Sequence, residues 1–227
     1  MRPAPNRERT SPVEMGSMRL PAIGASPSPA GPHVERVATG WIVCVAGFVA
    51  DHARVMTRLL EELPLRVEAL TLFGRPVATP RLTSWHGDPD ARYAYSGRAF
   101  DPAPWTPTLS ELRDALHAAT GTRFNSVLAN HYRDGRDSMG AHADDERELG
   151  PTRDDVRIAS ISLGAPRRFV LRERAGGARR EWSLGEGALL VMGGELQRTT
   201  RHAIPKTRRA VGPRLNLTFR VVDARPR

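Results

Sequence analysis

A seven-residue segment near the C-terminus carries side chains that could bind a small anion. Its sequence, Arg214-Leu215-Asn216-Leu217-Thr218-Phe219-Arg220, alternates polar and apolar residues. Side chains of a strand point alternately to its two faces, so the four polar residues share one face and the three apolar residues share the other. With the apolar side against a core, the polar side is either solvated or lines a pocket. The two arginines would suit a dianion, because a guanidinium binds a carboxylate through two parallel hydrogen bonds.

The second candidate group is His142-Ala143-Asp144, together with His202 further along the chain. Residues i and i+2 of an extended segment point the same way, so His142 and Asp144 can bind one ion. Two histidines and one carboxylate hold iron(II) while leaving positions open for a co-substrate and oxygen. The chain has 7 histidines, so such a pair also arises by chance. The metal interpretation gains weight because His202 precedes the Arg214 segment by only twelve residues.

Short strands must position these residues. Apolar and β-branched runs broken by Gly, Pro or charged turns predict strands over 124–132, 156–163, 167–173, 180–184, 187–192 and 214–222. Several strands with no helices between them indicate an antiparallel sandwich or barrel rather than a βαβ sheet.

The preceding part of the chain predicts two helices. An apolar strand over Trp41–Val49 is followed by Asp51 as a helix cap, by apolar residues at helical spacing and by Pro64 as a stop. A second helix follows Pro107-Thr108 and ends at Gly121. We therefore predict a mainly β fold with flanking helices, in which N-terminal helices pack on a cupin-like jelly roll, that is, a double-stranded β-helix.

The length of 227 residues suits one domain plus a tail. Residues 1–38 contain 7 of the 19 prolines and few large apolar groups, so we expect a disordered tail rich in Pro, Ser and Arg. Residues 39–227 then form the domain. We divide it into an N-terminal extension over 39–123, with the helices, and a jelly-roll core over 124–222.

The net charge of +9 is concentrated in the last third of the chain. Residues 1–150 hold 17 basic and 18 acidic side chains, whereas residues 151–227 hold 17 basic and 7 acidic ones. Such an excess favours an anionic partner, above all nucleic acid. The run from Arg167 to Arg180 would line a phosphate groove or form a solvated hairpin. A basic rim of Arg198, Arg201, Lys206, Arg208 and Arg209 would surround His202.

One cysteine, Cys44, excludes an intrachain disulfide and favours a reducing compartment. The longest apolar run, Trp41 to Ala50, is too short to cross a bilayer and lacks the flanks of a signal peptide. We expect a cytoplasmic, monomeric protein with no membrane partner and no obligate protein partner.

The order of these residues resembles one known family. Asn130-x-Tyr132, His142-x-Asp144, His202 and Arg214-x-Asn216-x-Thr218-x-Arg220 follow the pattern of the AlkB family of iron(II)- and 2-oxoglutarate-dependent dealkylating dioxygenases. The resemblance extends over residues 40–222 and includes Phe73-Gly74-Arg75, Pro80-Arg81 and Tyr93-x-Tyr95.

The resemblance implies roles for individual residues. His142, Asp144 and His202 would hold iron(II), with O2 as a co-substrate. Arg214 would bind the distal carboxylate of 2-oxoglutarate, and four further residues would contact the same molecule: Asn130, Tyr132, Asn216 and Thr218. Arg220 would lie near the metal-bound end of 2-oxoglutarate and act as a catalytic residue.

The resemblance also implies a reaction. Decarboxylation of 2-oxoglutarate would be coupled to hydroxylation of an N-methyl group on 1-methyladenine or 3-methylcytosine in DNA, with release of formaldehyde. The base must leave the duplex or come from a single strand. Asp145 would favour the positively charged alkylated base, unless it belongs to the solvated acidic run that follows.

Other residues are candidates for substrate contacts. Tyr93 and Tyr95 would cover the base or belong to the core, and Arg81 would lie nearby. Phe73, Gly74 and Arg75 resemble the hairpin of members that act on duplex DNA, where an apolar wedge fills the space that the base leaves. Phe73 would otherwise pack inward at the end of a strand.

Two alternatives remain at this point. The same oxygenase chemistry could act on RNA or on a protein side chain, because the iron and co-substrate residues do not define what is oxidised. A jelly roll that binds nucleic acid without catalysis is supported by the charge alone.

Overall fold

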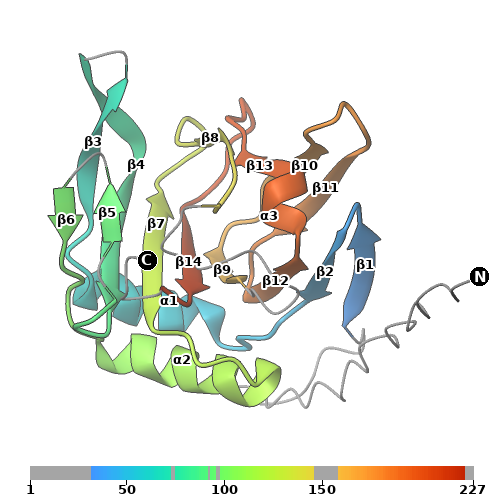
Figure 1. Ribbon diagram of the computed structural model, residues 1–227. Coiled ribbons are helices and arrows are strands. Elements are labelled where there is room, and N and C mark those ends of the chain that lie inside the picture. The colour runs from blue at the N-terminus through green and yellow to red at the C-terminus, as the bar shows by residue number, and fades with distance from the viewer. Residues whose placement is uncertain (1–31, 73–74, 92, 96–97, 146–157, 223–227) are drawn as a thin grey trace, which may run out of the picture.

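The computed structural model describes residues 32–72, 75–91, 93–95, 98–145 and 158–222 (Figure 1). Fourteen strands and three helices are assigned in these ranges. The helices are α1 (His52–Glu62), α2 (Pro107–Thr120) and α3 (Leu196–Thr199). The strands are β1 (His33–Val37), β2 (Gly40–Val45), β3 (Arg66–Leu72), β4 (Arg75–Gly87), β5 (Tyr93–Tyr95), β6 (Arg98–Phe100), β7 (Ser126–Tyr132), β8 (Met139–His142), β9 (Ile158–Gly164), β10 (Arg167–Glu173), β11 (Arg179–Leu184), β12 (Ala188–Gly194), β13 (Thr200–Ile204) and β14 (Arg214–Arg220).

The strands form two principal sheets, and every strand pair is antiparallel. The large sheet has eight strands in the order β1-β2-β12-β9-β14-β7-β4-β3, and the small sheet has four in the order β11-β10-β13-β8. Strands β5 and β6 form a separate hairpin. Strands from both predicted parts of the domain, 39–123 and 124–222, therefore share the large sheet.

Helices α1 and α2 cover one face of the large sheet (Figure 1). Leu215, Leu217 and Phe219 of β14 are buried there with leucines of both helices. On the opposite face, residues such as Ile42 and Met192 pack against Phe169 and other side chains of the small sheet. The polar residues of β14 thus face the space between the two sheets.

Helices α1 and α2 agree with the two predicted helices, whereas α3 was not predicted. Asp51 stands at the N-cap of α1, but its side chain makes no capping hydrogen bond. The N-cap of α2 is Thr106, whose hydroxyl accepts a hydrogen bond from the Leu109 amide, and Pro107 is the first helical residue. Gly121 ends α2 in the left-handed conformation, with φ 70°. None of the helices in the described ranges is long and apolar enough to cross a membrane.

The predicted mainly β fold with flanking helices is confirmed. The strands that were not predicted include β1, β3, β4, β6, β8 and β13. The expected disordered tail over 1–38 is wrong at 33–37, because these residues form β1. This strand pairs residue by residue with Gly40 to Cys44, from Val37↔Gly40 to His33↔Cys44. Strands β8 and β13 are short and carry few β-branched residues, so composition alone does not predict them.

Candidate metal and co-substrate site

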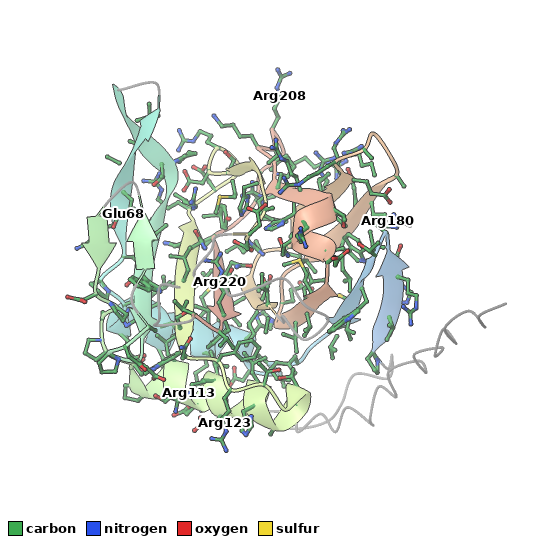
Figure 2. All side chains as sticks on the ribbon, viewed as in Figure 1. Glu68, Arg113, Arg123, Arg180, Arg208 and Arg220 are labelled. Atoms are coloured by element: carbon green, nitrogen blue, oxygen red, sulfur yellow. The ribbon has the colours of Figure 1, made fainter. Side chains whose placement is uncertain are left out.

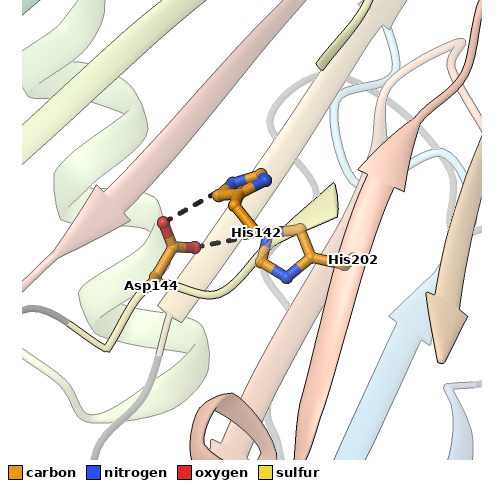
Figure 3. A group of neighbouring side chains, drawn as sticks. All are labelled: His142, Asp144 and His202. Atoms are coloured by element: carbon orange, nitrogen blue, oxygen red, sulfur yellow. Dashed lines mark ion pairs between the residues drawn. The ribbon is translucent and has the colours of Figure 1, made fainter. Parts of the chain in front are cut away.

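Three predicted ligands come together between the sheets. His142 ends β8 and pairs in register with His202 of β13, and Asp144 follows two residues after His142. The Nε2 atoms of His142 and His202 lie 3.9 Å and 3.5 Å from the two carboxylate oxygens of Asp144. One ligand atom from each residue lies within 4.8 Å of the others. Figure 3 shows the carboxylate facing both rings.

The surroundings of both imidazoles suit metal binding. The distance from His142 Nδ1 to the Gly140 carbonyl oxygen is 2.9 Å, so Nδ1 donates this hydrogen bond and Nε2 keeps its lone pair. His202 is 7% exposed, and burial lowers its pKa to about 4. An imidazole that stays neutral at pH 7 can coordinate a metal without first losing a proton.

Asp144 is held as a carboxylate despite its burial. It is 3% exposed, and burial alone would raise its pKa. The charge of Arg220 and the two imidazoles outweigh that effect and lower the pKa. Arg220 donates a hydrogen bond to Asp144 Oδ1. The backbone amide of Asp144 donates to Gln197 Oε1 at 3.0 Å, which fixes the segment after β8 to α3.

Arg214 is a buried cation with free donors. It is 1% exposed, and one of its nitrogens donates to Ser162 Oγ at 2.7 Å and to Asn216 Oδ1 at 2.5 Å. Its Nε and its other terminal nitrogen have no partner in the described part of the chain. Burial lowers its pKa to about 10, so it remains charged at neutral pH. Buried charges without a partner are costly, so this arrangement fits a bound anion.

The other predicted co-substrate residues surround Arg214. Asn216 Nδ2 donates to Thr218 Oγ1 at 2.9 Å, and the Arg214 guanidinium lies 5.3 Å from the centre of the Tyr132 ring. Asn130 accepts a hydrogen bond from Arg81 Nε at 2.7 Å. Strands β7 and β14 pair Asn130 with Asn216 and Tyr132 with Arg214, which explains why residues distant in sequence share one chamber.

A cavity of about 640 Å³ adjoins two of the three candidate ligands, His142 and Asp144. His142, Asp144 and Arg220 lie at one part of its wall, and residues of β3, β4 and the segment 101–103 line much of the rest. Pockets that hold small organic groups usually measure about 300–1,000 Å³. The cavity is therefore large enough for a planar base beside the metal position.

Of the predicted substrate residues, some lie at the cavity, some lie elsewhere and some are not described. Arg81 lines the cavity. The Asp145 carboxylate is 2.5 Å from a terminal nitrogen of Arg174, and Asp145 is not among the residues that line the cavity. Phe73 and Gly74 lie outside the described residues. Arg75, Tyr93 and Tyr95 lie in β4 and β5, but their side chains are not described.

The predicted basic residues lie in two regions, one around β13 and one along β10 and β11. Arg198, Arg201, Lys206, Arg208 and Arg209 are exposed around β13, and Figure 2 shows Arg208 projecting from the body of the protein. Along β10 and β11, Arg180 pairs with Glu35 at 2.5 Å and Arg168 pairs with Glu181 at 3.6 Å. These carboxylates neutralise part of the predicted phosphate groove, and Arg167 is buried.

Sequence reasoning missed several polar residues of the site. Ser160 and Ser162 of β9 donate to Asn216 Oδ1 at 3.0 Å and 3.3 Å. Their alternation with apolar residues in β9 was a signal that could have been used. Gln197 had no such signal, because it lies in a four-residue helix.

Comparison with known proteins agrees with this geometry. The model of the 2OG-Fe(II) oxygenase superfamily matches residues 42–220. The chain belongs to this superfamily. It is thus an enzyme that uses iron(II), 2-oxoglutarate and O2, and the predicted dioxygenase class and cofactors are confirmed.

Similar proteins place the chain in the AlkB branch of the superfamily. Mouse DNA oxidative demethylase ALKBH2 is 37% identical over 180 residues, which cover 73% of this chain and 74% of the mouse protein. Human DNA oxidative demethylase ALKBH2 is 34% identical over 219 residues, or 90% of this chain and 82% of the human protein. Human alpha-ketoglutarate-dependent dioxygenase alkB homolog 3 is 40% identical over 158 residues, which cover 65% of this chain and 54% of the human protein.

A solved structure supports the fold alone. The structure of OsALKBH1 matches with a TM-score of 0.60 at 17% sequence identity and covers 83% of this chain and 100% of its own.

Proposed function

We propose that this oxygenase is an oxidative demethylase that repairs N-alkylated bases in DNA, such as 1-methyladenine and 3-methylcytosine. The observation that carries the proposal is the 640 Å³ cavity that ends at His142, Asp144 and Arg220. It is supported by the similarity to proteins named as DNA oxidative demethylases in mouse and human. The exposed basic residues around β13 suit a polyanion.

His142, Asp144 and His202 would hold the iron. The donor set fits the ion, because two imidazoles and a carboxylate converge with their ligand atoms within 4.8 Å. Bound iron(II) supplies the activation of O2 that couples decarboxylation of 2-oxoglutarate to hydroxylation of the methyl group. Arg220 would hold the Asp144 carboxylate in position for the metal.

Arg214 would bind the distal carboxylate of 2-oxoglutarate. Its Nε and one terminal nitrogen are buried without partners in the described residues, and a carboxylate can accept from both. Asn130, Tyr132, Asn216 and Thr218 would line the same chamber. The hydrogen bonds from Arg214 to Asn216 and from Asn216 to Thr218 hold this part of the chamber in shape before the co-substrate arrives, which reduces the entropy lost on binding.

The cavity would take the flipped base. The methyl group must reach the metal position, and only the part of the wall at His142, Asp144 and Arg220 adjoins it. Once hydroxylated, the methyl group leaves as formaldehyde and restores the base. Arg81 lies on the cavity wall, and contacts from Asp145, Tyr93, Tyr95, Phe73, Gly74 and Arg75 remain predictions.

The partner, the assembly and the location are also proposals. Alkylated DNA is the expected partner, and a monomer without an obligate protein partner is sufficient for the site because all three candidate metal ligands come from one chain. A cytoplasmic location agrees with the single cysteine.

The test is turnover of a methylated oligonucleotide. Purified protein is incubated with iron(II), 2-oxoglutarate and DNA containing 3-methylcytosine, and unmodified cytosine and formaldehyde are measured. Matched reactions contain methylated RNA or a methylated peptide. Equal release of cytosine and formaldehyde from DNA is expected. Turnover of RNA or peptide with none of DNA would contradict the DNA assignment and leave the oxygenase assignment intact.

A further inference from the structure

Arg167 differs from the other arginines of the β10–β11 hairpin. It is the first residue of β10, is 3% exposed, and forms no ion pair within the described residues. Its guanidinium instead donates to three backbone carbonyls, those of Asp134, Asp137 and Pro205, each at 2.9 Å. Three main-chain acceptors at good hydrogen-bond distance use the planar fork that distinguishes arginine from lysine.

These carbonyls belong to two loops that meet above the small sheet. Asp134 and Asp137 lie between β7 and β8, and Pro205 follows β13. The loops also touch directly, because the Thr207 amide donates to the Gly135 carbonyl at 2.9 Å. A Cβ atom at Gly135 would come within 2.5 Å of the Thr207 carbonyl oxygen. The two loops therefore pack too closely for any residue other than glycine at this position.

The same guanidinium supports the co-substrate chamber. Tyr132 ends β7 just before the loop, and its ring lies 5.7 Å from the Arg167 guanidinium and 5.3 Å from that of Arg214. Tyr132 is 2% exposed, so it cannot change its position without moving one of the two arginines. Arg167 thus fixes the ring against which Arg214 rests.

We infer that Arg167 is a positioning residue for 2-oxoglutarate: it holds Tyr132 and the 133–138 loop so that the free nitrogens of Arg214 face the co-substrate. This inference rests on the proposed binding of 2-oxoglutarate at Arg214. Arg167 acts through Tyr132 and the loop, and none of its three hydrogen-bond partners is a candidate metal ligand. Its loss should weaken binding of the co-substrate and spare the chemical step.

The test compares Arg167→Lys with Arg168→Lys. The second variant is a matched control, because Arg168 is the next residue, is exposed and pairs with Glu181 at 3.6 Å. Lysine keeps the charge but cannot reach three carbonyls with a fixed fork. We expect the KM for 2-oxoglutarate to rise roughly tenfold in Arg167→Lys, with kcat within about twofold of wild type. The control should match wild type in both values.

A direct binding measurement separates this inference from the proposed function. Calorimetric titration with 2-oxoglutarate in the presence of Mn(II), which replaces iron(II) without turnover, should show the same tenfold loss of affinity in Arg167→Lys. If wild type does not bind 2-oxoglutarate, the proposed function fails. If wild type and Arg167→Lys bind it equally, only the role of Arg167 fails.

A second variant tests the link between the loop and the co-substrate. Gly135→Ala disturbs the same loop from its other side and leaves Arg167 unchanged. We expect a smaller rise in the KM for 2-oxoglutarate, with faster amide hydrogen exchange over residues 133–138. Unchanged KM and unchanged exchange in a folded Gly135→Ala protein would overturn the link between the loop and the co-substrate.

Discussion

The two faces of the large sheet have opposite chemistry. On the helix-covered face, Leu215, Leu217 and Phe219 of β14 are fully buried among apolar side chains. On the inner face of the same strand, Arg214, Asn216 and Thr218 are also buried, but they contact polar groups. Burial stabilises the fold on the first face, because apolar area leaves water. On the second face burial makes an unfavourable contribution, because the Arg214 cation has no carboxylate partner among the described residues.

The difference shows how the protein combines stability with a reactive chamber. The apolar face provides the free energy that keeps the sheet in place. The inner face can then hold a buried charge such as Arg214, although burying that charge is itself unfavourable. Substitutions on the two faces should therefore separate stability from activity.

The largest effect is expected at a metal ligand. His202→Ala removes one of three donors, so we expect a loss of turnover of roughly a thousandfold and loss of the bound metal. Metal content and formaldehyde release measure the two effects. His33→Ala, an exposed histidine of β1, is the control and should keep both. Retention of metal and activity in His202→Ala would rule out this residue as a ligand.

A leucine on the helix-covered face should affect stability alone. Leu217 is fully buried, so Leu217→Ala is expected to lower the free energy of unfolding by about 3 kcal/mol. Denaturant unfolding measures this change, and Leu60→Ala, at a side chain that is 38% exposed, is the control. The folded variant should keep the wild-type KM for 2-oxoglutarate. A large rise in KM would show that the two faces are coupled.

Arg214→Met, on the same strand as Leu217, should weaken co-substrate binding and leave stability nearly unchanged. Loss of the guanidinium is expected to weaken 2-oxoglutarate binding about 100-fold, or about 2.7 kcal/mol. The free energy of unfolding should fall by less than about 1 kcal/mol, because the buried charge is removed together with its desolvation cost. Titration and denaturant unfolding measure the two quantities, with the exposed Arg36→Met as the control. Severe unfolding would mean that Arg214 supports the fold directly.

The smallest effect is expected at the edge of the helical layer. Thr106 caps α2 by accepting a hydrogen bond from the Leu109 amide at 3.3 Å. Thr106→Ala should cost about 1 kcal/mol of stability and leave kcat and KM unchanged. Ser110→Ala, within the same helix, is a suitable control for thermal unfolding. Equal loss in both variants would show that the cap contributes nothing specific.

The alternation of polar and apolar residues in β14 allowed the residues of the inner face to be predicted from the sequence. Arg214 to Arg220 has a strict period of two, and the observed strand covers these residues, ending two residues before the predicted end at 222. The pairing of β14 with β7 then brings Asn130 and Tyr132 beside it. Regular strands convert sequence spacing directly into positions in space, which is why these residues could be predicted to share a face.

Other contacts depend on tertiary packing that no local pattern reveals. Arg174 contacts Asp145, a residue 29 positions away on a different segment. Arg167 belongs to a run of arginines in the sequence, but its three carbonyl partners come from loops whose meeting point depends on the whole fold. Asp51 has a residue type that favours capping, yet the backbone there does not bring its carboxylate to a free amide.

Strand β8 lies at the edge of the small sheet and has only four residues. Its pairing with β13 is irregular, with a register shift between His202 and Ile204. Short edges with few hydrogen bonds open more readily than the rest of a sheet. A cation bound by both His142 and His202 would stabilise the pairing of β8 with β13. Cleavage by a protease near residues 139–145 should therefore be slower when the metal is bound.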